Sequence, residues 1–172
     1  MRQLSITLAC ALLALVLSSF SAFAQTETFS DANVDYTFEL PSATWRLIEK
    51  PDADHALAGF IYGDRNDGYL QIRKEVVDSG VKPENLSQRE SDQKLRFLPG
   101  FVEGKEDPFG GRMNGVAFNY EYTSAGKPMA GRIYYLQADN RTIYVLRFTG
   151  LRDRLIRIRN QTDVIARSFR LK

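Results

Sequence analysis

The chain has 172 residues, and its composition is 44% hydrophobic, 12% aromatic and 26% charged. These fractions are typical of a globular domain and exclude a disordered or collagen-like chain. Lys and Arg number 23 against 21 Asp and Glu, so the formal net charge is only +2. This near balance of the whole chain gives no global reason to expect nucleic acid or an anionic membrane as a partner.

The first 24 residues have the pattern of a cleaved secretory signal peptide. Arg2 gives a short positive start, Leu8–Leu17 is an unbroken apolar run, and Ala22-Phe23-Ala24 matches a cleavage site with small residues. The alternative is an uncleaved membrane anchor, but the apolar run is too short to cross roughly 30 Å of hydrocarbon comfortably. We therefore expect an exported protein, periplasmic or extracellular after cleavage, without a stable membrane anchor.

The residue chemistry of the expected mature chain excludes most familiar catalytic sites. Cys10 is the only cysteine and lies in the signal segment, so no disulfide, thiolate nucleophile or sulfur metal ligand is available. His55 is the only histidine, and no serine lies in a G-x-S-x-G turn of the hydrolase type. We predict no catalytic residue, no cofactor and no metal site.

Residues 25–34 are polar and are predicted to form a flexible tail ahead of a single domain over residues 35–172. Beyond the tail, short runs of β-branched and aromatic residues alternate with turn residues, which predicts antiparallel strands joined by hairpins. Asp64–Gly68 is predicted to be a hairpin loop, because Asn, Asp and Gly tolerate the positive φ angles of such turns. The first four predicted strands are residues 36–40, 45–48, 57–62 and 69–77.

A first helix is predicted over residues 83–98. Pro83 suits its first turn, Glu84 lies where a negative charge is favourable, and Pro99-Gly100 ends it. Strands resume after this helix, at residues 101–102, 115–123, 132–137 and 142–149. In the last of these, alternate residues are apolar on both sides, which predicts a central strand that is covered on both faces.

A second helix is predicted after Gly150, because apolar residues follow at helical spacing. This stripe consists of Leu151, Leu155, Ile158, Thr162, Ile165 and Phe169. Residues 168–171 are open to an alternative prediction, a closing strand. The order of strands, helix, strands and helix predicts an α+β fold, an antiparallel sheet with one helix on each face in a three-layer α/β/α sandwich.

The predicted domain begins with Tyr36-Thr37-Phe38-Glu39-Leu40-Pro41, and Trp45 follows after a short gap. This order of strand, proline, gap and tryptophan resembles the start of PsbP-like domains, a superfamily that includes the extrinsic photosystem II subunit and bacterial periplasmic DcrB-type proteins. The long helix leading into Ser168-Phe169 is also similar, so the resemblance spans roughly Tyr36 to Leu171. It departs from the usual pattern at Ser42-Ala43-Thr44, where a glycine commonly precedes the tryptophan. The resemblance implies a sandwich that mostly serves as a non-catalytic accessory or docking module, and it carries over no catalytic residue.

The strongest local charge is the arginine-rich segment 141–172. On its predicted helix, Arg152 and Arg159 lie on one flank of the apolar stripe, and Arg154 and Arg157 lie on the other. Arginine stems beside an apolar stripe commonly pack along it while the guanidinium stays in water. The alternative is that these four arginines bind a partner, either an acidic protein or an anionic lipid surface.

The tyrosines of the predicted strands have two possible roles. Tyrosines on strands usually pack beneath a helix, with the hydroxyl group at the edge. However, the predicted first helix has few apolar residues, chiefly Leu86, Phe97 and Leu98, so it is expected to cover its face of the sheet incompletely. The alternative is therefore a shallow groove for a small ligand or peptide, lined by Tyr120, Tyr122 and Tyr135.

Two segments superficially resemble metal sites. Asp64 and Glu75 have the spacing of the first and last ligands of an EF-hand, but Tyr69 stands where that loop requires glycine. Residues 52–55 combine two aspartates with His55, yet neighbouring loop residues seldom converge on one ion without a distant ligand. We interpret the first segment as a hairpin turn and the second as a solvated loop.

The sequence favours a secreted, non-enzymatic binding or accessory domain that docks a protein partner in the cell envelope. The alternative function is a small-ligand carrier that uses the tyrosine groove between the sheet and the first helix. An enzyme is the least supported class, because nothing in the sequence brings two carboxylates together.

Overall fold

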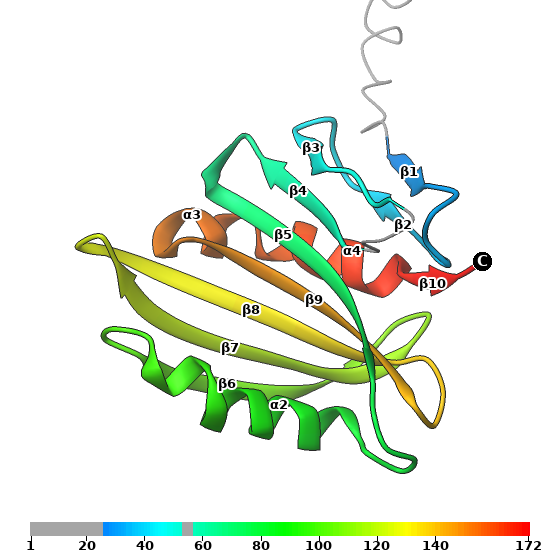
Figure 1. Ribbon diagram of the computed structural model, residues 1–172. Helices are drawn as coiled ribbons and strands as arrows, with labels where there is room; N and C mark the ends of the chain where they lie inside the picture. The colour runs from blue at the N-terminus through cyan, green and yellow to red at the C-terminus, as the bar shows by residue number, and fades with distance from the viewer. Residues whose placement is uncertain (1–25, 53–56) are drawn as a thin grey trace, which may run out of the picture.

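A seven-stranded antiparallel sheet runs through the middle of the structure (Figure 1), with its strands in the order β3-β4-β5-β9-β8-β7-β6. The computed structural model describes residues 26–52 and 57–172. The predicted strands all overlap strands of this sheet, apart from residues 36–40, which belong to a second sheet. The seven strands are β3 (Trp45–Glu49), β4 (Ala58–Tyr62), β5 (Asp64–Val76), β6 (Val102–Gly110), β7 (Asn114–Ser124), β8 (Lys127–Gln137) and β9 (Thr142–Leu151).

Strand β9 is the central strand that the sequence predicts. It lies between β5 and β8 and pairs with both in antiparallel register. Ile143 and Val145 face one side and are fully buried, while Tyr144, Leu146 and Phe148 face the other side and are at most 1% exposed. Because β9 has apolar side chains on both faces, each face of the sheet must be packed against another element that shields it from water.

One face is covered by α2 (Pro83–Gln93) and the short 3₁₀ helix η1 (Leu95–Phe97) (Figure 1). Pro83 lies in the first turn, and the Asn85 side chain accepts a 3.1 Å hydrogen bond from the Lys82 N–H. Leu86 and Leu95 pack into the apolar cluster of this face. The predicted helix over residues 83–98 is therefore present but divided, and it ends at Leu98, whose extended backbone suits a residue before proline.

The opposite face is covered by two helices and a small sheet rather than by one helix. The helices are α3 (Arg152–Arg157) and α4 (Arg159–Ser168). The small antiparallel sheet has the order β1-β2-β10, with β1 (Glu27–Ser30), β2 (Tyr36–Leu40) and β10 (Arg170–Leu171). Helix α3 packs on β5, β8 and β9 of the large sheet, whereas α4 packs on β2 (Figure 1).

The break between α3 and α4 falls at Ile158, whose backbone angles are φ −98° and ψ 10°. Leu155, Ile158 and Ile165 are all buried in the core on this side of the sheet. The apolar stripe therefore continues at helical spacing across the break, so the sequence pattern predicts one uninterrupted helix. Ser168-Phe169 leads into β10, which confirms the alternative prediction of a closing strand.

The segment 25–34, expected to be a flexible tail, contains strand β1. Residues 27–30 pair with residues 37–40 of β2, and the Thr37 hydroxyl donates a 2.6 Å hydrogen bond to the carbonyl of Phe29. The Phe29 ring is only 8% exposed and lies 5.1 Å from the Phe38 ring and 5.0 Å from the Phe60 ring. A single aromatic residue thus anchors a segment whose overall composition is polar.

The hairpin between β4 and β5 turns at Gly63, whose φ of +65° favours glycine. The sequence predicts the loop at Asp64–Gly68, but strand β5 already begins at Asp64. The Asp64 carboxylate accepts hydrogen bonds from the backbone N–H groups of Asn66 and Asp67, at 2.7 and 3.2 Å. The register passes from Tyr62↔Asp64 to Ile61↔Tyr69, so residues 65–68 have no partner in β4 and form a bulge where the sequence predicts the loop.

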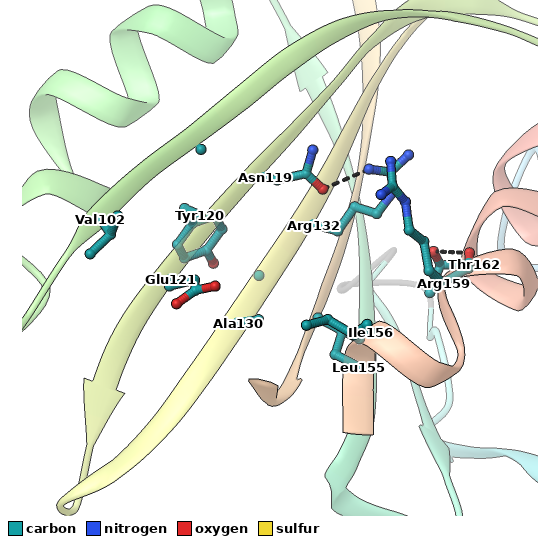
Figure 2. A pocket seen from close by; sticks show the side chains of 12 residues that line it. Val102, Asn119, Tyr120, Glu121, Ala130, Arg132, Leu155, Ile156, Arg159 and Thr162 are labelled. Carbon is teal, nitrogen blue, oxygen red and sulfur yellow. Dashed lines mark hydrogen bonds between the residues drawn. The ribbon is translucent and has the colours of Figure 1, made fainter. Parts of the chain in front are cut away.

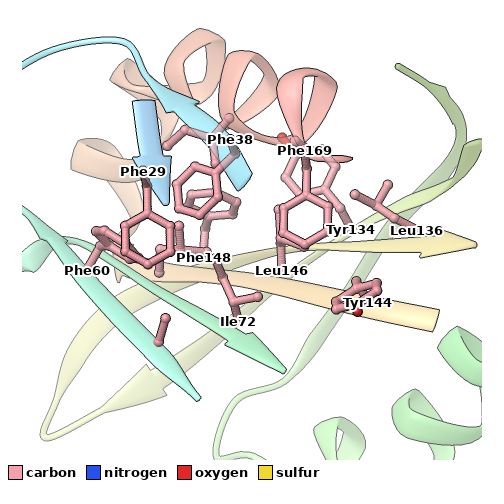
Figure 3. Close-up of a cluster of buried hydrophobic side chains, with 14 of the residues drawn as sticks. Phe29, Phe38, Phe60, Ile72, Tyr134, Leu136, Tyr144, Leu146, Phe148 and Phe169 are labelled. Carbon is pink, nitrogen blue, oxygen red and sulfur yellow. The ribbon is translucent and has the colours of Figure 1, made fainter. Parts of the chain in front are cut away.

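An aromatic cluster joins the small sheet to the large one (Figure 3). Phe38 of β2 is fully buried, and its ring lies 5.4 Å from Phe60 of β4 and 6.1 Å from Phe169, which precedes β10. Phe148 and Tyr134 extend the cluster across β9 and β8, with ring centroids 5.6 Å apart. The two sheets therefore share one core.

We predict that Phe38→Ala destabilises the fold by about 3–5 kcal/mol, because it removes a buried ring that contacts both sheets. The free energy of unfolding would be measured by urea denaturation. Phe97→Ala is the matched control, since Phe97 is 75% exposed, and it should change stability by no more than about 0.5 kcal/mol. Equal effects of the two substitutions would contradict a core centred on Phe38.

Candidate functional site

A groove lies beside α3, where the large sheet extends past the helices. Helix α3 covers β5, β9 and β8, but β7 and β6 continue beyond it. The turn of the β6–β7 hairpin is held to α4, because the Arg112 N–H donates a 2.9 Å hydrogen bond to the Arg167 carbonyl. The resulting cavity has a volume of about 350 Å³ (Figure 2). It is lined by Val102, Gly104, Asn119, Tyr120, Glu121, Ala130, Gly131, Arg132, Leu155, Ile156, Arg159 and Thr162.

One part of the groove is apolar and open to water. Val102 on β6 is 57% exposed and Ile156 on α3 is 60% exposed, and both line the cavity. Ala130 and Leu155 form buried surface between them. On the α2 side of the same strands, a Cβ atom at Gly131 would lie 2.1 Å from the ring of Tyr120, so glycine is required where this ring crosses β8. The groove therefore offers water an apolar surface that the fold itself does not cover.

The other part of the groove is polar and centred on Arg132 of β8. Its guanidinium donates hydrogen bonds to the Tyr134 hydroxyl and the Asn119 side-chain carbonyl, both at 2.6 Å, and to the Asp163 carboxylate at 2.9 Å. The Tyr134 hydroxyl donates in turn to Asp163 at 2.5 Å. Figure 2 shows the Arg132 and Arg159 side chains extending toward the same end of the cavity. The side chain of Arg132 is only 8% exposed, so β7, β8 and α4 fix its position.

The surroundings keep this cluster in a single charge state. Burial alone would lower the pKa of Arg132, but the neighbouring Tyr134 and Asp163 raise it above the usual value. Burial also raises the pKa of Tyr134 well above its ordinary range. Arg132 is therefore a permanent cation and Tyr134 stays protonated at neutral pH. Neither group is suited to transfer a proton, so the cluster is suited to positioning and recognition.

A second buried polar cluster lies on the α2 face and centres on Glu90. The Glu90 side chain is 3% exposed and accepts hydrogen bonds from Arg73 at 2.7 Å, Arg147 at 2.8 Å and the Tyr135 hydroxyl at 2.7 Å. Burial alone would raise the pKa of Glu90, but Arg147 and Arg73 lower it below 4.5. These contacts join α2 to β5, β8 and β9, so the cluster fixes the position of the helix on the sheet.

The three tyrosines of the predicted ligand groove lie on the α2 side of the sheet, where they occupy different environments. Tyr135 is fully buried, and Tyr120 is 3% exposed and has a pKa that burial raises to about 12. Tyr122 is half-buried, with its ring 5.7 Å from that of Tyr120. Of the three, only Tyr120 lines the groove described above. Ligand binding by this set stays a prediction.

The four predicted partner-binding arginines lie around α3. Arg159 lines the groove, and Arg152 lies 3.5 Å from the groove residue Glu121. Arg154 and Arg157 instead line a separate cavity of about 180 Å³, in which Arg154 lies 3.5 Å from Asp67. The structure thus divides the arginines between two surfaces. Their contact with a partner stays a prediction.

The remaining expectations concern metals and membranes. Within residues 26–52 and 57–172, no group of three or more His, Cys, Asp or Glu side chains is placed to hold a metal ion. The suspected ligand His55, the single cysteine and the predicted signal peptide lie outside the described residues. None of the helices in the described part of the chain has the length and hydrophobicity needed to span a membrane.

The architecture is that of a PsbP-like α+β fold. No family model and no curated protein matches the sequence. Similar solved structures include cyanobacterial PsbP (CyanoP) from Synechocystis sp. PCC 6803, with a TM-score of 0.59 and 12% identity over 90% of this chain and 96% of that one. The predicted resemblance to PsbP-like domains is therefore confirmed as a likeness of fold.

Two other solved structures have the same fold. The Ran-binding protein Mog1p from Saccharomyces cerevisiae has a TM-score of 0.60 and 11% identity over 86% of this chain and 96% of that one. LpqN, described as involved in cell envelope biogenesis of Mycobacterium tuberculosis, has a TM-score of 0.54 and 21% identity over 86% and 91%. At these identities the similarity concerns the fold alone.

We predict that Glu90→Gln destabilises the fold at neutral pH by about 3–5 kcal/mol, because it leaves the largely buried charge of Arg147 without its counterion and leaves Arg73 with Glu75 alone. The folded pKa of Glu90 lies below 4.5, so its stabilising contribution is present above about pH 4.5 and is lost as the pH falls through the folded pKa. The wild type should therefore lose more stability than Glu90→Gln between about pH 7 and pH 3.

Urea denaturation at a series of pH values would check this prediction. Glu106→Gln is the matched control, because Glu106 is exposed on β6. It should leave both the stability at neutral pH and its pH dependence close to those of the wild type. Parallel pH profiles for the wild type and Glu90→Gln would argue against the Glu90 cluster as a source of acid sensitivity.

Proposed function

We propose that this protein is an exported, non-enzymatic binding domain that docks a protein partner in the cell envelope through the groove beside α3. The observation that carries the proposal is the exposed apolar surface of Val102 and Ile156, which lies next to a buried, fixed cluster of polar groups around Arg132. An apolar centre with a polar and charged rim is the usual composition of a protein interface.

The charges around the groove fit the same function. Arg152 and Arg159 are two of the four arginines that the sequence indicates as partner-binding residues, and both lie at this groove. Arginine is enriched at interfaces, where its planar guanidinium forms several hydrogen bonds at once. Both arginines lie on helical elements with defined positions, so a partner would meet a largely preformed surface.

The similar structures support the proposal as analogies of fold. Mog1p is described as a Ran-binding protein, and LpqN as a protein involved in cell envelope biogenesis. Because one fold hosts many functions, the argument depends on the groove rather than on these names. The proposed export depends on the signal-like residues 1–24, which lie outside the described part of the chain.

We predict that Ile156→Asp weakens capture of the envelope partner at least about tenfold, because it places a charge in the apolar centre of the groove. The measurement is affinity capture of crosslinked partners from the native envelope fraction, quantified for wild type and variant. Phe97→Asp is the matched control, since Phe97 is 75% exposed but lies on η1 at the opposite face. A partner captured equally well by both variants would place the interface elsewhere.

A second candidate function, a small-ligand carrier, is favoured by the volume of the groove. About 350 Å³ falls within the range of roughly 300–1,000 Å³ that is typical of small-molecule sites. A carrier would gain thermal stability in proportion to ligand saturation. If a ligand found in a thermal-shift screen stabilises Tyr120→Ala as strongly as the wild type, the tyrosine Tyr120 has no part in the site.

A further inference from the structure

The charges at the groove are balanced everywhere except at Arg159. Arg132 is paired with Asp163 at 2.9 Å, and Arg152 lies 3.5 Å from Glu121. No carboxylate of residues 26–52 and 57–172 lies within ion-pair distance of the Arg159 guanidinium. Asp107 is close enough for its pKa to be lowered slightly by Arg159, but its principal partner is the Lys105 ammonium, which hydrogen-bonds it. The polar end of the groove therefore carries one cation without a counterion.

Arg132 has donor capacity left at the same end. A guanidinium has five N–H groups, and three of those on Arg132 are used by Tyr134, Asn119 and Asp163. The other two have no partner within the described part of the chain. Because the side chain is 8% exposed and held on three sides, these N–H groups keep a fixed direction. A carboxylate is the group that two adjacent guanidinium groups recognise best, since it accepts several hydrogen bonds in one plane.

The apolar end restricts what can carry that carboxylate. A partner that covers Val102 and Ile156 also removes water from the neighbouring Arg159. Removing water from a cation without a counterion is strongly unfavourable, so the partner must itself supply a negative charge at this point. The occupant is therefore apolar over one part and anionic at the other.

We propose that the groove binds a polypeptide segment of the partner in which an aspartate or glutamate side chain, flanked by apolar residues, reaches Arg159 and Arg132. This inference rests on the proposed docking function and defines the chemistry of the partner. A polypeptide fits better than a small carboxylate because Val102 belongs to β6, the last strand of the sheet. The outer backbone groups of β6 have no strand partner among the residues that the structure describes, so they remain free to bond a chain that leaves the groove.

The test is a selection of random heptapeptides displayed with both ends fused, so that no peptide carries a free terminal carboxylate. The purified protein is the bait, and Ile156→Asp is used for counter-selection to remove peptides that bind elsewhere. The enriched peptides should contain an Asp or Glu beside apolar residues. One of them is then synthesised with acetylated and amidated ends, together with a version in which the acidic residue is replaced by its amide.

The expected result is a double-mutant cycle with strong coupling. Replacing the acidic residue of the peptide by its amide should weaken binding about tenfold, and Arg159→Gln should weaken it by a similar factor. Combining the two changes should cost little more than either one alone. Arg89→Gln is the matched control, because Arg89 is exposed on α2 at the opposite face of the sheet, and it should bind like the wild type.

Other outcomes separate the two proposals. If Ile156→Asp abolishes partner capture while Arg159→Gln and the amide peptide bind normally, groove docking stands and recognition of an acidic side chain is wrong. If only peptides with a free C-terminus or a free alkyl carboxylate such as decanoate bind, in an Arg159-dependent manner, the side-chain proposal is overturned. If Ile156→Asp affects neither capture nor peptide binding, both proposals fail.

Discussion

The two-sided burial of β9 is the constraint on which the rest of the structure depends. Its alternate side chains face two separate apolar clusters, so the sheet is stable only if both faces are covered. Helix α2 covers one face, and Glu90 secures it through Arg73 and Arg147. On the other face, α3, α4 and the small sheet cover β9 and its neighbours, but the parts of β7 and β6 around Glu121 and Val102 lie beyond this cover. The groove is the part of the second face that this cover leaves open.

The elements with a regular local pattern could be predicted from the sequence. The alternation along β9, the Pro83 start of α2 and the run at residues 36–40 all depend on neighbouring residues, and the structure contains each of them. Strand β1 could not be predicted in this way, because its stability comes from Phe29 packing on distant aromatic rings. The apolar residues keep their helical spacing across Ile158, so the sequence pattern does not predict the break between α3 and α4. Because neither strand β1 nor the break at Ile158 is predicted by the local pattern, the small sheet that covers the second face is not predicted either.

The candidate site was only partly accessible to sequence reasoning. Arg152 and Arg159 stand out as members of an arginine-rich segment, and both lie at the groove. Arg132 does not stand out, although it organises the polar end. Its partners Asn119 and Asp163 are 13 and 31 residues away, on β7 and α4. No local spacing links these three residues, because only the pairing of β7 with β8 and the docking of α4 bring them together.

The position of β2 between β1 and β10 has a consequence for the time course of folding. Arg170 pairs with Thr37, and Leu171 with Tyr36, so strands from opposite ends of the described chain meet in one sheet. Contacts between residues so distant in sequence form late, because a long loop must close before they are made. The aromatic rings of β2 therefore have no complete cover until Phe169 and β10 are in place. Until then the nascent chain carries an open strand edge and exposed phenylalanines, features that promote aggregation.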